Sequence, residues 1–239
     1  MSQGSRPGGV NLPAPTSLCG VQPLTYRPDS VTDYEIGEKT RLFGGALTIN
    51  SDFYYIRWHS VQQYINPPCD FPYTVNGGTA TSYGPEIEVI ARLGHGFTLS
   101  ANGSTTNATL TSVPANLQGQ LTVGQRILNI PRGTASASLS YRRALFSDYD
   151  LVARVSGDYV GDSVDVAYAK ATLPSYTLMK ARIGIENDKW SISLFGDNLT
   201  DTRAILSINN TSFGWLDPAV TRASTNQPRT IGVDIDRKF

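Results

Sequence analysis

The amino-acid sequence predicts an all-β protein, an antiparallel up-and-down β-barrel whose strands cross a membrane. About nine segments alternate between apolar and polar residues, as strands with one apolar and one polar face do. Short turns, near residues 44, 95, 146 and 188, alternate with long loops, near 72, 119, 166 and 214. Brief turns on one side and long loops on the other are typical of outer-membrane barrels. The aromatic residues expected near strand ends, where a girdle would lie, are Tyr34, Phe53, Tyr55, Phe97, Tyr141, Trp190 and Phe239.

The strand ranges follow from this alternation. The clearest strand is 132–142, in which Thr and Ser residues alternate with apolar ones. Glu38 and Arg237 are exceptions, because each places a charge at an apolar position, where lipid tolerates it only near an interface. The first strand begins after residue 31 and ends before the Gly44-Gly45 turn. The other strands are expected at about 46–64, 81–93, 97–104, 149–159, 176–186, 190–199 and 229–239.

A soluble β-sandwich is the alternative fold, since its strands also alternate. The expected strands are longer than the usual five or six residues, which weighs against a sandwich. Their apolar faces also hold many small residues, which fill a core poorly but are tolerable against lipid. Examples are Ala135, Ala137, Ala153 and Ala181.

Composition excludes several other classes. Hydrophobic residues make up 40% of the 239 and charged residues 17%, and no window approaches the 18 consecutive apolar residues of a membrane-spanning helix. Lys and Arg number 20, as do Asp and Glu, so no net charge favours nucleic acid. Residues 1–31 are rich in Pro, Gly and Ser, lack the apolar core of a secretory signal and are expected to form a loop or disordered lead-in.

No catalytic, cofactor or metal site is predicted. His59 and His95 lie on different elements, far apart in sequence and without ligand-spaced companions. Asp234 and Asp236 share a strand face and are expected to line a barrel lumen rather than to perform acid–base chemistry. Cys19 and Cys69 both lie in Pro-rich loops, and their spacing leaves open two free thiols or one disulfide.

Two motifs near the end of the chain resemble a known family. NLTD at 198–201 and PRTIGV at 228–233 together resemble the end of TonB-dependent outer-membrane receptors. Residues 28–63 and 76–88 resemble earlier wall segments of the same family. The family fold is a 22-stranded barrel filled by an N-terminal plug. The resemblance therefore implies that 32–239 supplies the last nine strands, and that the plug, the TonB-contacting segment and the earlier strands are missing, so that the barrel is open or incomplete.

The resemblance also implies a function. Such receptors capture a scarce small-molecule nutrient, commonly an iron–siderophore chelate, and use TonB-derived energy to take it up. The implied location is the Gram-negative outer membrane, with long loops extracellular and short turns periplasmic. The implied partners are outer-membrane lipid, the barrel assembly machinery, the missing plug and strands and, indirectly, the TonB complex. The alternatives are a small autonomous porin or adhesin barrel and a soluble sandwich that acts as a binding module.

Specific residues take roles from this resemblance. The Cys19–Cys69 disulfide is favoured, because relatives often carry Cys in both loops. The C-terminal pattern resembles an insertion signal for the barrel assembly machinery, formed by Ile231, Val233, Ile235 and Phe239. Candidate ligand-contacting aromatics, which alternatively pack loop on loop, are Tyr64, Phe71, Tyr73, Phe213 and Trp215.

Overall fold

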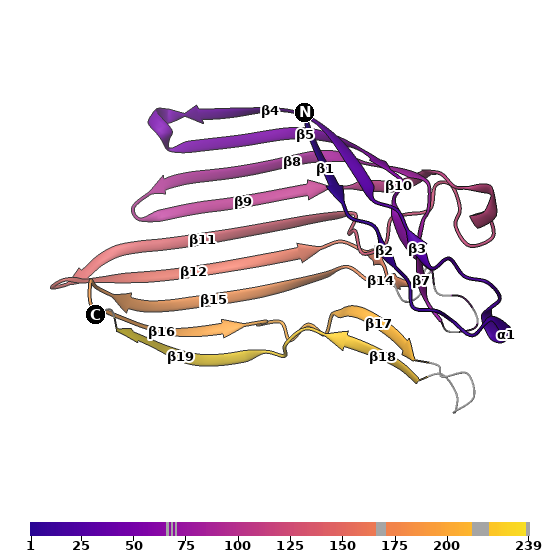
Figure 1. The fold of residues 1–239 in the computed structure, drawn as a ribbon. Coiled ribbons are helices and arrows are strands. Elements are labelled where there is room, and N and C mark those ends of the chain that lie inside the picture. The colour runs from indigo at the N-terminus through magenta and orange to yellow at the C-terminus, as the bar shows by residue number, and fades with distance from the viewer. Residues whose placement is uncertain (66, 68, 70, 166–170, 212–219, 238–239) are drawn as a thin grey trace.

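The computed structural model describes residues 1–239 except 66, 68, 70, 166–170, 212–219 and 238–239. Its main feature is one antiparallel sheet of eleven strands. Figure 1 shows the long strands lying side by side, with tight turns at one end and smaller hairpins at the other. The sheet is not closed, because its path runs from β1 (Ser2–Arg6) to β19 (Thr230–Arg237) without joining these two strands.

All nine strands predicted from alternation are present, which confirms the predicted open, incomplete barrel. They are β4 (Asp29–Leu42), β5 (Leu47–His59), β8 (Thr79–Gly94), β9 (Phe97–Thr105), β11 (Gly133–Phe146), β12 (Tyr149–Val160), β15 (Tyr176–Glu186), β16 (Trp190–Asp197) and β19. Neighbours in sequence pair with each other as hairpins or across a loop. Within the described residues, no helix is long and apolar enough to cross a membrane.

The strand register places like residues side by side. Leu139 pairs with Leu99 on one side and with Val155 on the other, and Ile183 pairs with Leu194. Because side chains alternate between faces, these pairings put apolar residues from all nine strands on one surface, here called the apolar face. Its side chains stay exposed, and Ile183 retains 52% of its accessible surface. A face this apolar and this exposed suits contact with lipid.

Aromatic residues border the apolar face at both ends. Near the long loops they are Tyr34, Phe53, Tyr55, Tyr83 and Tyr159, and near the short turns Phe97, Tyr141, Phe146, Tyr149 and Trp190. Tyr149 and Tyr159 lie ten residues apart on β12, which corresponds to about 33 Å of strand. A strand tilted by about 40° would then span about 25 Å, the height of the apolar band of an outer-membrane barrel.

Glu38 and Arg237, the two charges predicted at apolar positions, have different surroundings. Arg237 lies near the short-turn end, and its guanidinium carbon is 5.3 Å from the centre of the Trp190 ring. A cation over an indole at an interface is favourable, so Arg237 fits its position. Glu38 lies midway along β4, paired with Ser51. We find no structural compensation for Glu38 among the described residues.

The connections also alternate as predicted. The turn between β4 and β5 is a single 3-10 turn, Phe43–Gly45, in which Gly44 and Gly45 have positive φ. The long connections carry the small paired strands, namely β2 (Gly9–Val10) with β3 (Thr25–Tyr26), β6 (Gln62–Ile65) with β7 (Tyr73–Asn76), β13 (Ser163–Val164) with β14 (Thr172–Leu173), and β17 (Ile205–Thr211) with β18 (Val220–Thr225). Figure 1 shows these hairpins and helix α1 (Thr16–Cys19) at the end opposite the turns.

Residues 1–31 were expected to form a loop or disordered lead-in, but strands occupy both ends of this segment, since β4 already begins at Asp29. Residues 2–6 form β1, which pairs with the first five residues of β4. This strand is polar throughout and exposed, so it has no alternation from which to predict it. Backbone hydrogen bonds to an open sheet edge hold it in place instead.

The buried hydrophobic core lies among the long loops rather than in the wall. It joins the β6–β7 hairpin with residues 108–127, which were expected to be loop. Strand β10 (Asn107–Ser112) adds to β8 there, followed by the 3-10 turn Ala115–Leu117. The buried members are Val61, Ile65, Tyr73, Val75, Ala80, Ala108, Leu110, Leu117, Leu121 and Ile127. This core makes the two loops one packed unit above the wall.

Candidate functional site

The polar face of the sheet is hollowed. Side chains of β8, β9, β11, β12, β15, β16 and β19 line one hollow of about 710 Å³. Its lining includes small Ser and Asn residues of β9 and β11 and charged residues of β12, β15 and β19. The sheet therefore curves towards its polar face, as a barrel wall curves around a hydrated lumen.

The charges on this face are arranged in ion pairs that join neighbouring strands or reach across one intervening strand. Arg182 donates to Asp234 at 2.6 Å, and the Lys180 ammonium lies 3.6 Å from Asp158. Nearer the turns, Arg142 of β11 contacts both Asp150 (2.9 Å) and Glu186. Asp234 therefore pairs with an arginine on the wall, as expected for a lumen-lining carboxylate, although each exposed pair contributes little to stability.

Arg154 differs from these pairs. It lies directly opposite Arg182 in the register and donates to the Ser138 hydroxyl at 3.1 Å. Among the described residues, no carboxylate forms an ion pair with it. Arg154 is therefore held by a hydroxyl, whereas Arg182 and Lys180 are each paired with a carboxylate.

The loop that carries β2, α1 and β3 is joined to the β6–β7 loop by a disulfide and by several hydrogen bonds. Cys19 and Cys69 form a disulfide, with Cα atoms 5.5 Å apart. The Asn11 side chain accepts a hydrogen bond from the Thr74 N–H and donates one to the Thr74 carbonyl, both at 2.8 Å. Gln22 donates to the Phe71 carbonyl at 3.1 Å. A covalent link and backbone-like hydrogen bonds hold these loops as one surface.

Asp29 ties the base of these loops to the wall. It is only 3% exposed and lies at the start of β4. Its carboxylate accepts hydrogen bonds from Arg6, from the Trp58 indole (3.0 Å) and from the Gln62 N–H (3.2 Å). The Arg6 guanidinium also lies over the Trp58 ring, 5.4 Å from its centre. A buried carboxylate with three donors satisfies the usual requirement for burial of a charge.

The five aromatics proposed to contact ligand fall in different surroundings. Tyr64 and Phe71 are 39% and 40% exposed in the second long loop, where a solute could reach them. Burial raises the pKa of the Tyr64 phenol above its ordinary value, so it stays neutral. Tyr73 is 8% exposed and donates to Gln120 at 3.0 Å inside the loop core, so it packs loop on loop. Phe213 and Trp215 lie outside the described residues.

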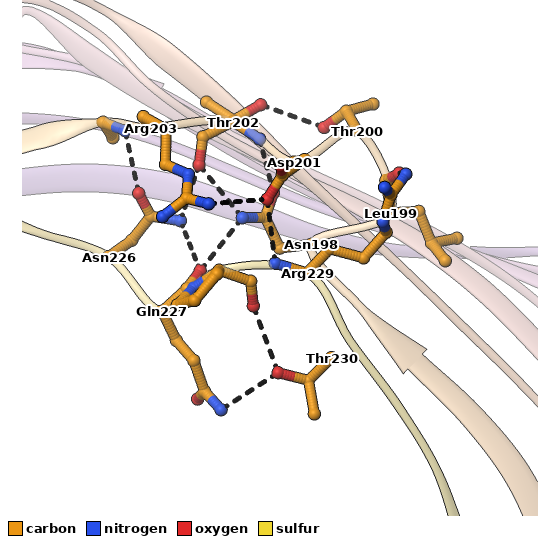
Figure 2. Close-up of polar contacts among 12 residues, drawn as sticks. Asn198, Leu199, Thr200, Asp201, Thr202, Arg203, Asn226, Gln227, Arg229 and Thr230 are labelled. Carbon is orange, nitrogen blue, oxygen red and sulfur yellow. Dashed lines mark hydrogen bonds and ion pairs between the residues drawn. The ribbon is translucent and has the colours of Figure 1, made fainter.

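The NLTD motif forms a compact cluster of hydrogen bonds where β16 leaves the wall (Figure 2). Asn198 is 4% exposed and has positive φ, which Asn tolerates better than most residues. Its side chain accepts from the Thr202 N–H (2.9 Å) and donates to the carbonyls of Thr202 and Gln227 (both 3.0 Å). The motif thus closes on itself and reaches the segment that enters the last strand.

The PRTIGV motif adds to the same cluster of hydrogen bonds. The Arg229 N–H donates to the Asp201 carboxylate at 3.1 Å, and this bond is the main cause that lowers the pKa of Asp201. Asn226 accepts from the Ala204 N–H and donates to the Thr202 carbonyl. Figure 2 shows these contacts converging between the two chain segments. The two family motifs therefore work as one unit that brings β16 and β19 together where their loop leaves the sheet.

The proposed insertion signal lies at the open edge of the sheet. Ile231, Val233 and Ile235 share the apolar face of β19 and are 66%, 65% and 62% exposed. Phe239 lies outside the described residues. The three isoleucine and valine side chains are therefore available for contact with lipid or a partner protein.

An open, curved antiparallel sheet with an exposed apolar face, aromatic borders, a polar hollow and long packed loops at one end is the wall of an outer-membrane β-barrel. The chain belongs to the TonB-dependent receptor family, an outer-membrane family of transport receptors. Residues 2–199 match its model, described as TonB dependent receptor-like, beta-barrel.

Known proteins agree with this assignment. The chain is 29% identical over 208 residues to the ferrioxamine B receptor of Salmonella typhimurium (strain SL1344), covering 83% of this chain and 28% of the receptor. The structure is similar to that of the ferric yersiniabactin uptake receptor FyuA from Yersinia pestis (TM-score 0.76, 20% identity, 98% of this chain and 33% of that one). It is also similar to the copper transporter OprC (TM-score 0.68, 14% identity, 89% and 32%). The chain spans about a third or less of the length of these relatives.

Proposed function

We propose that this chain is the C-terminal wall segment of a receptor that takes up an iron chelate, or a similar scarce nutrient, with TonB-derived energy. In this proposal 32–239 is wall, 1–31 is largely an extracellular loop, the long loops are extracellular and the short turns are periplasmic. The barrel assembly machinery reads the C-terminal pattern that ends at Phe239. The observation that carries the proposal is the apolar face of nine strands, capped at one end by loops with their own hydrophobic core.

The exposed loop aromatics are the proposed contribution to ligand capture. Tyr64 and Phe71 stand on loops that a disulfide and a hydrophobic core hold still, so little entropy is lost when a ligand binds. A ferric chelate is the favoured ligand class because the ferrioxamine B receptor is a sequence relative. OprC, a copper transporter with a similar fold, shows that the fold alone does not decide the cargo.

Two experiments test the proposal. The expressed chain should sediment with the outer membrane and migrate in a heat-modifiable way; a freely soluble monomer would contradict it. Ferric ferrioxamine B should quench the tryptophan fluorescence of the detergent-solubilised chain, and Tyr64→Ala or Phe71→Ala should weaken binding by about tenfold. Phe43→Ala is the matched control, since Phe43 is 81% exposed at the short-turn end. Equal losses in all three variants would refute the assigned ligand contacts.

A further inference from the structure

A groove interrupts the apolar face below the long loops. Ile87, Gly103, Ala135 and Tyr159 form one row across four paired strands. The two central residues are small and the outer two are large, so the row leaves a trough. This trough has a volume of about 350 Å³, and Pro85 and Gly133 extend it towards the loop end. We call it the rim groove.

A polar pocket of about 370 Å³ adjoins the rim groove on its loop side. The groove and the pocket share Pro85 and Thr105, and the pocket is further lined by Tyr83, Arg126 and Arg132. The Tyr83 hydroxyl accepts a hydrogen bond from Asn107 at 2.9 Å, which leaves its own proton free to be donated. An apolar trough therefore opens directly into a pocket of hydrogen-bond donors.

This pocket carries a net positive charge. Arg126 and Arg132 share one carboxylate, Asp162, at 2.7 Å and 3.3 Å. Arg126 is held further by bonds to the carbonyls of Ile130 and Asp162, so its position is fixed. The Arg132 side chain is 67% exposed and makes only the one, longer contact with the carboxylate among the ion pairs of the described residues. Its guanidinium can therefore bind a second anion.

The depth of the pocket indicates the kind of anion. Tyr83 belongs to the aromatic border near the long loops and lies 6.5 Å from Phe53, ring centre to ring centre. Aromatic borders mark the level of lipid head groups. A guanidinium at this level pairs well with phosphate, and an apolar trough running from it towards the centre of the band matches an acyl chain.

From this geometry we propose that the rim groove and Arg132 bind one phosphate-bearing lipid of the leaflet at the long-loop end. An acyl chain lies over Gly103 and Ala135, and the lipid phosphate accepts hydrogen bonds from Arg132 and Tyr83. The inference rests on the proposed function, since the apolar face must meet a bilayer. It adds a specific lipid site on the outer surface of the wall, distinct from the polar hollow that faces the lumen.

The test measures lipid retention by native mass spectrometry of the full chain, released from vesicles that mix dimyristoyl phosphatidic acid with dimyristoyl phosphatidylcholine. We expect phosphatidic acid to be retained about fivefold more than phosphatidylcholine. Ala135→Leu, which fills the groove, and Arg132→Ala, which removes the guanidinium, should each abolish this preference. Arg132→Lys, which keeps the charge, should restore part of it.

Matched controls lie on the same face. Ala153→Leu adds the same bulk away from the groove, and Arg143→Ala removes an exposed arginine near the short turns. Both should retain phosphatidic acid as the unmodified chain does. Equal retention of the two lipids, or the same loss in controls and groove variants, would overturn the lipid site. Full displacement by inorganic phosphate would show an anion site without an acyl groove. A chain that never enters the vesicles would instead contradict the proposed function.

Discussion

An arginine at the centre of the apolar face tests directly whether that face meets lipid. Val155 lies on β12 between Leu139 and Ala181 and is 42% exposed. It stands six residues from Tyr149, which places it about 15 Å up a band about 25 Å high if the strand is tilted by about 40°. Val155→Arg would therefore put a charge near mid-depth. The expected cost is about 2–4 kcal/mol in a bilayer.

Depth supplies the control for this prediction. Leu151 is on the same strand and face, two residues from Tyr149 at the short-turn border. Leu151→Arg should cost only about 0–1 kcal/mol, because an arginine near an interface reaches the head groups. On a water-facing surface both substitutions would cost less than about 0.5 kcal/mol.

The assay is equilibrium urea unfolding of the chain in phosphatidylcholine vesicles, followed by tryptophan fluorescence. The urea midpoint should fall clearly for Val155→Arg and hardly at all for Leu151→Arg, at an unchanged slope. Equal effects of the two substitutions, or a change below about 0.5 kcal/mol for Val155→Arg, would refute the assignment of this face to lipid.

Three further predictions concern the loops. Asn198→Ala should destabilise the chain by about 3 kcal/mol in urea unfolding, because it orphans the Thr202 N–H and keeps positive φ, while Asn198→Gly, which relieves φ, should cost less; equal costs would exclude backbone strain. Leu110→Ala, at a residue 1% exposed, should cost about 2–5 kcal/mol and speed hydrogen exchange in β6–β7 but not in the wall; unchanged exchange there would contradict a shared loop core. The hydrogen bond from Arg126 is the main cause that lowers the pKa of Asp162 from 3.8 in the folded chain. Ionised Asp162 therefore stabilises the loop above that pH, and this stabilisation is lost as the pH falls through the lowered pKa. Asp162→Asn should remove this pH dependence of loop melting, and an unaltered pH profile would refute the role of the ion pair.

The wall could be predicted from sequence because its pattern is local. Each strand alternates with a period of two, and strands that follow one another in the chain pair with each other, so the strands can be located from neighbouring residues alone. The strand 132–142, expected from alternating Ser and Ala residues, is found as β11. The contact that stabilises Arg237 could be assigned only from the structure, because the pairing of β19 with β16 places Trp190 next to it.

The loop core could not be predicted with the same ease, because its contacts join distant segments. Leu110 belongs to the same buried cluster as Val61 and Tyr73, and no local pattern indicates that these distant segments meet. A weak signal existed in NATLTS at 107–112, whose alternating Ala108 and Leu110 form the inner face of β10. The hydrogen bonds to the Asp29 carboxylate likewise join Arg6, Trp58 and Gln62, which come from three separate elements.

The family motifs illustrate a third case, in which a pattern is recognisable before its physical role is known. NLTD and PRTIGV identify the family by resemblance. Their role follows only from the structure, where Asn198 and Asp201 bind the segment at Gln227 and Arg229. A short Asn–Asp motif next to a strand end indicates a turn, but not which distant backbone groups it satisfies.

An accessibility scan along β11 tests whether one face of the wall meets lipid and the other meets water. Single cysteines at 134–141 would be spin-labelled in the chain reconstituted in lipid vesicles, with Cys19 and Cys69 paired as the disulfide and so unreactive. We expect lipid-soluble oxygen to reach labels on the apolar face, at Ala135, Ala137, Leu139 and Tyr141. A water-soluble nickel chelate should reach labels on the polar face, at Thr134, Ser136, Ser138 and Ser140. Absence of alternation, or labels on the apolar face shielded from both reagents as in a packed sandwich core, would contradict the assignment of that face to lipid.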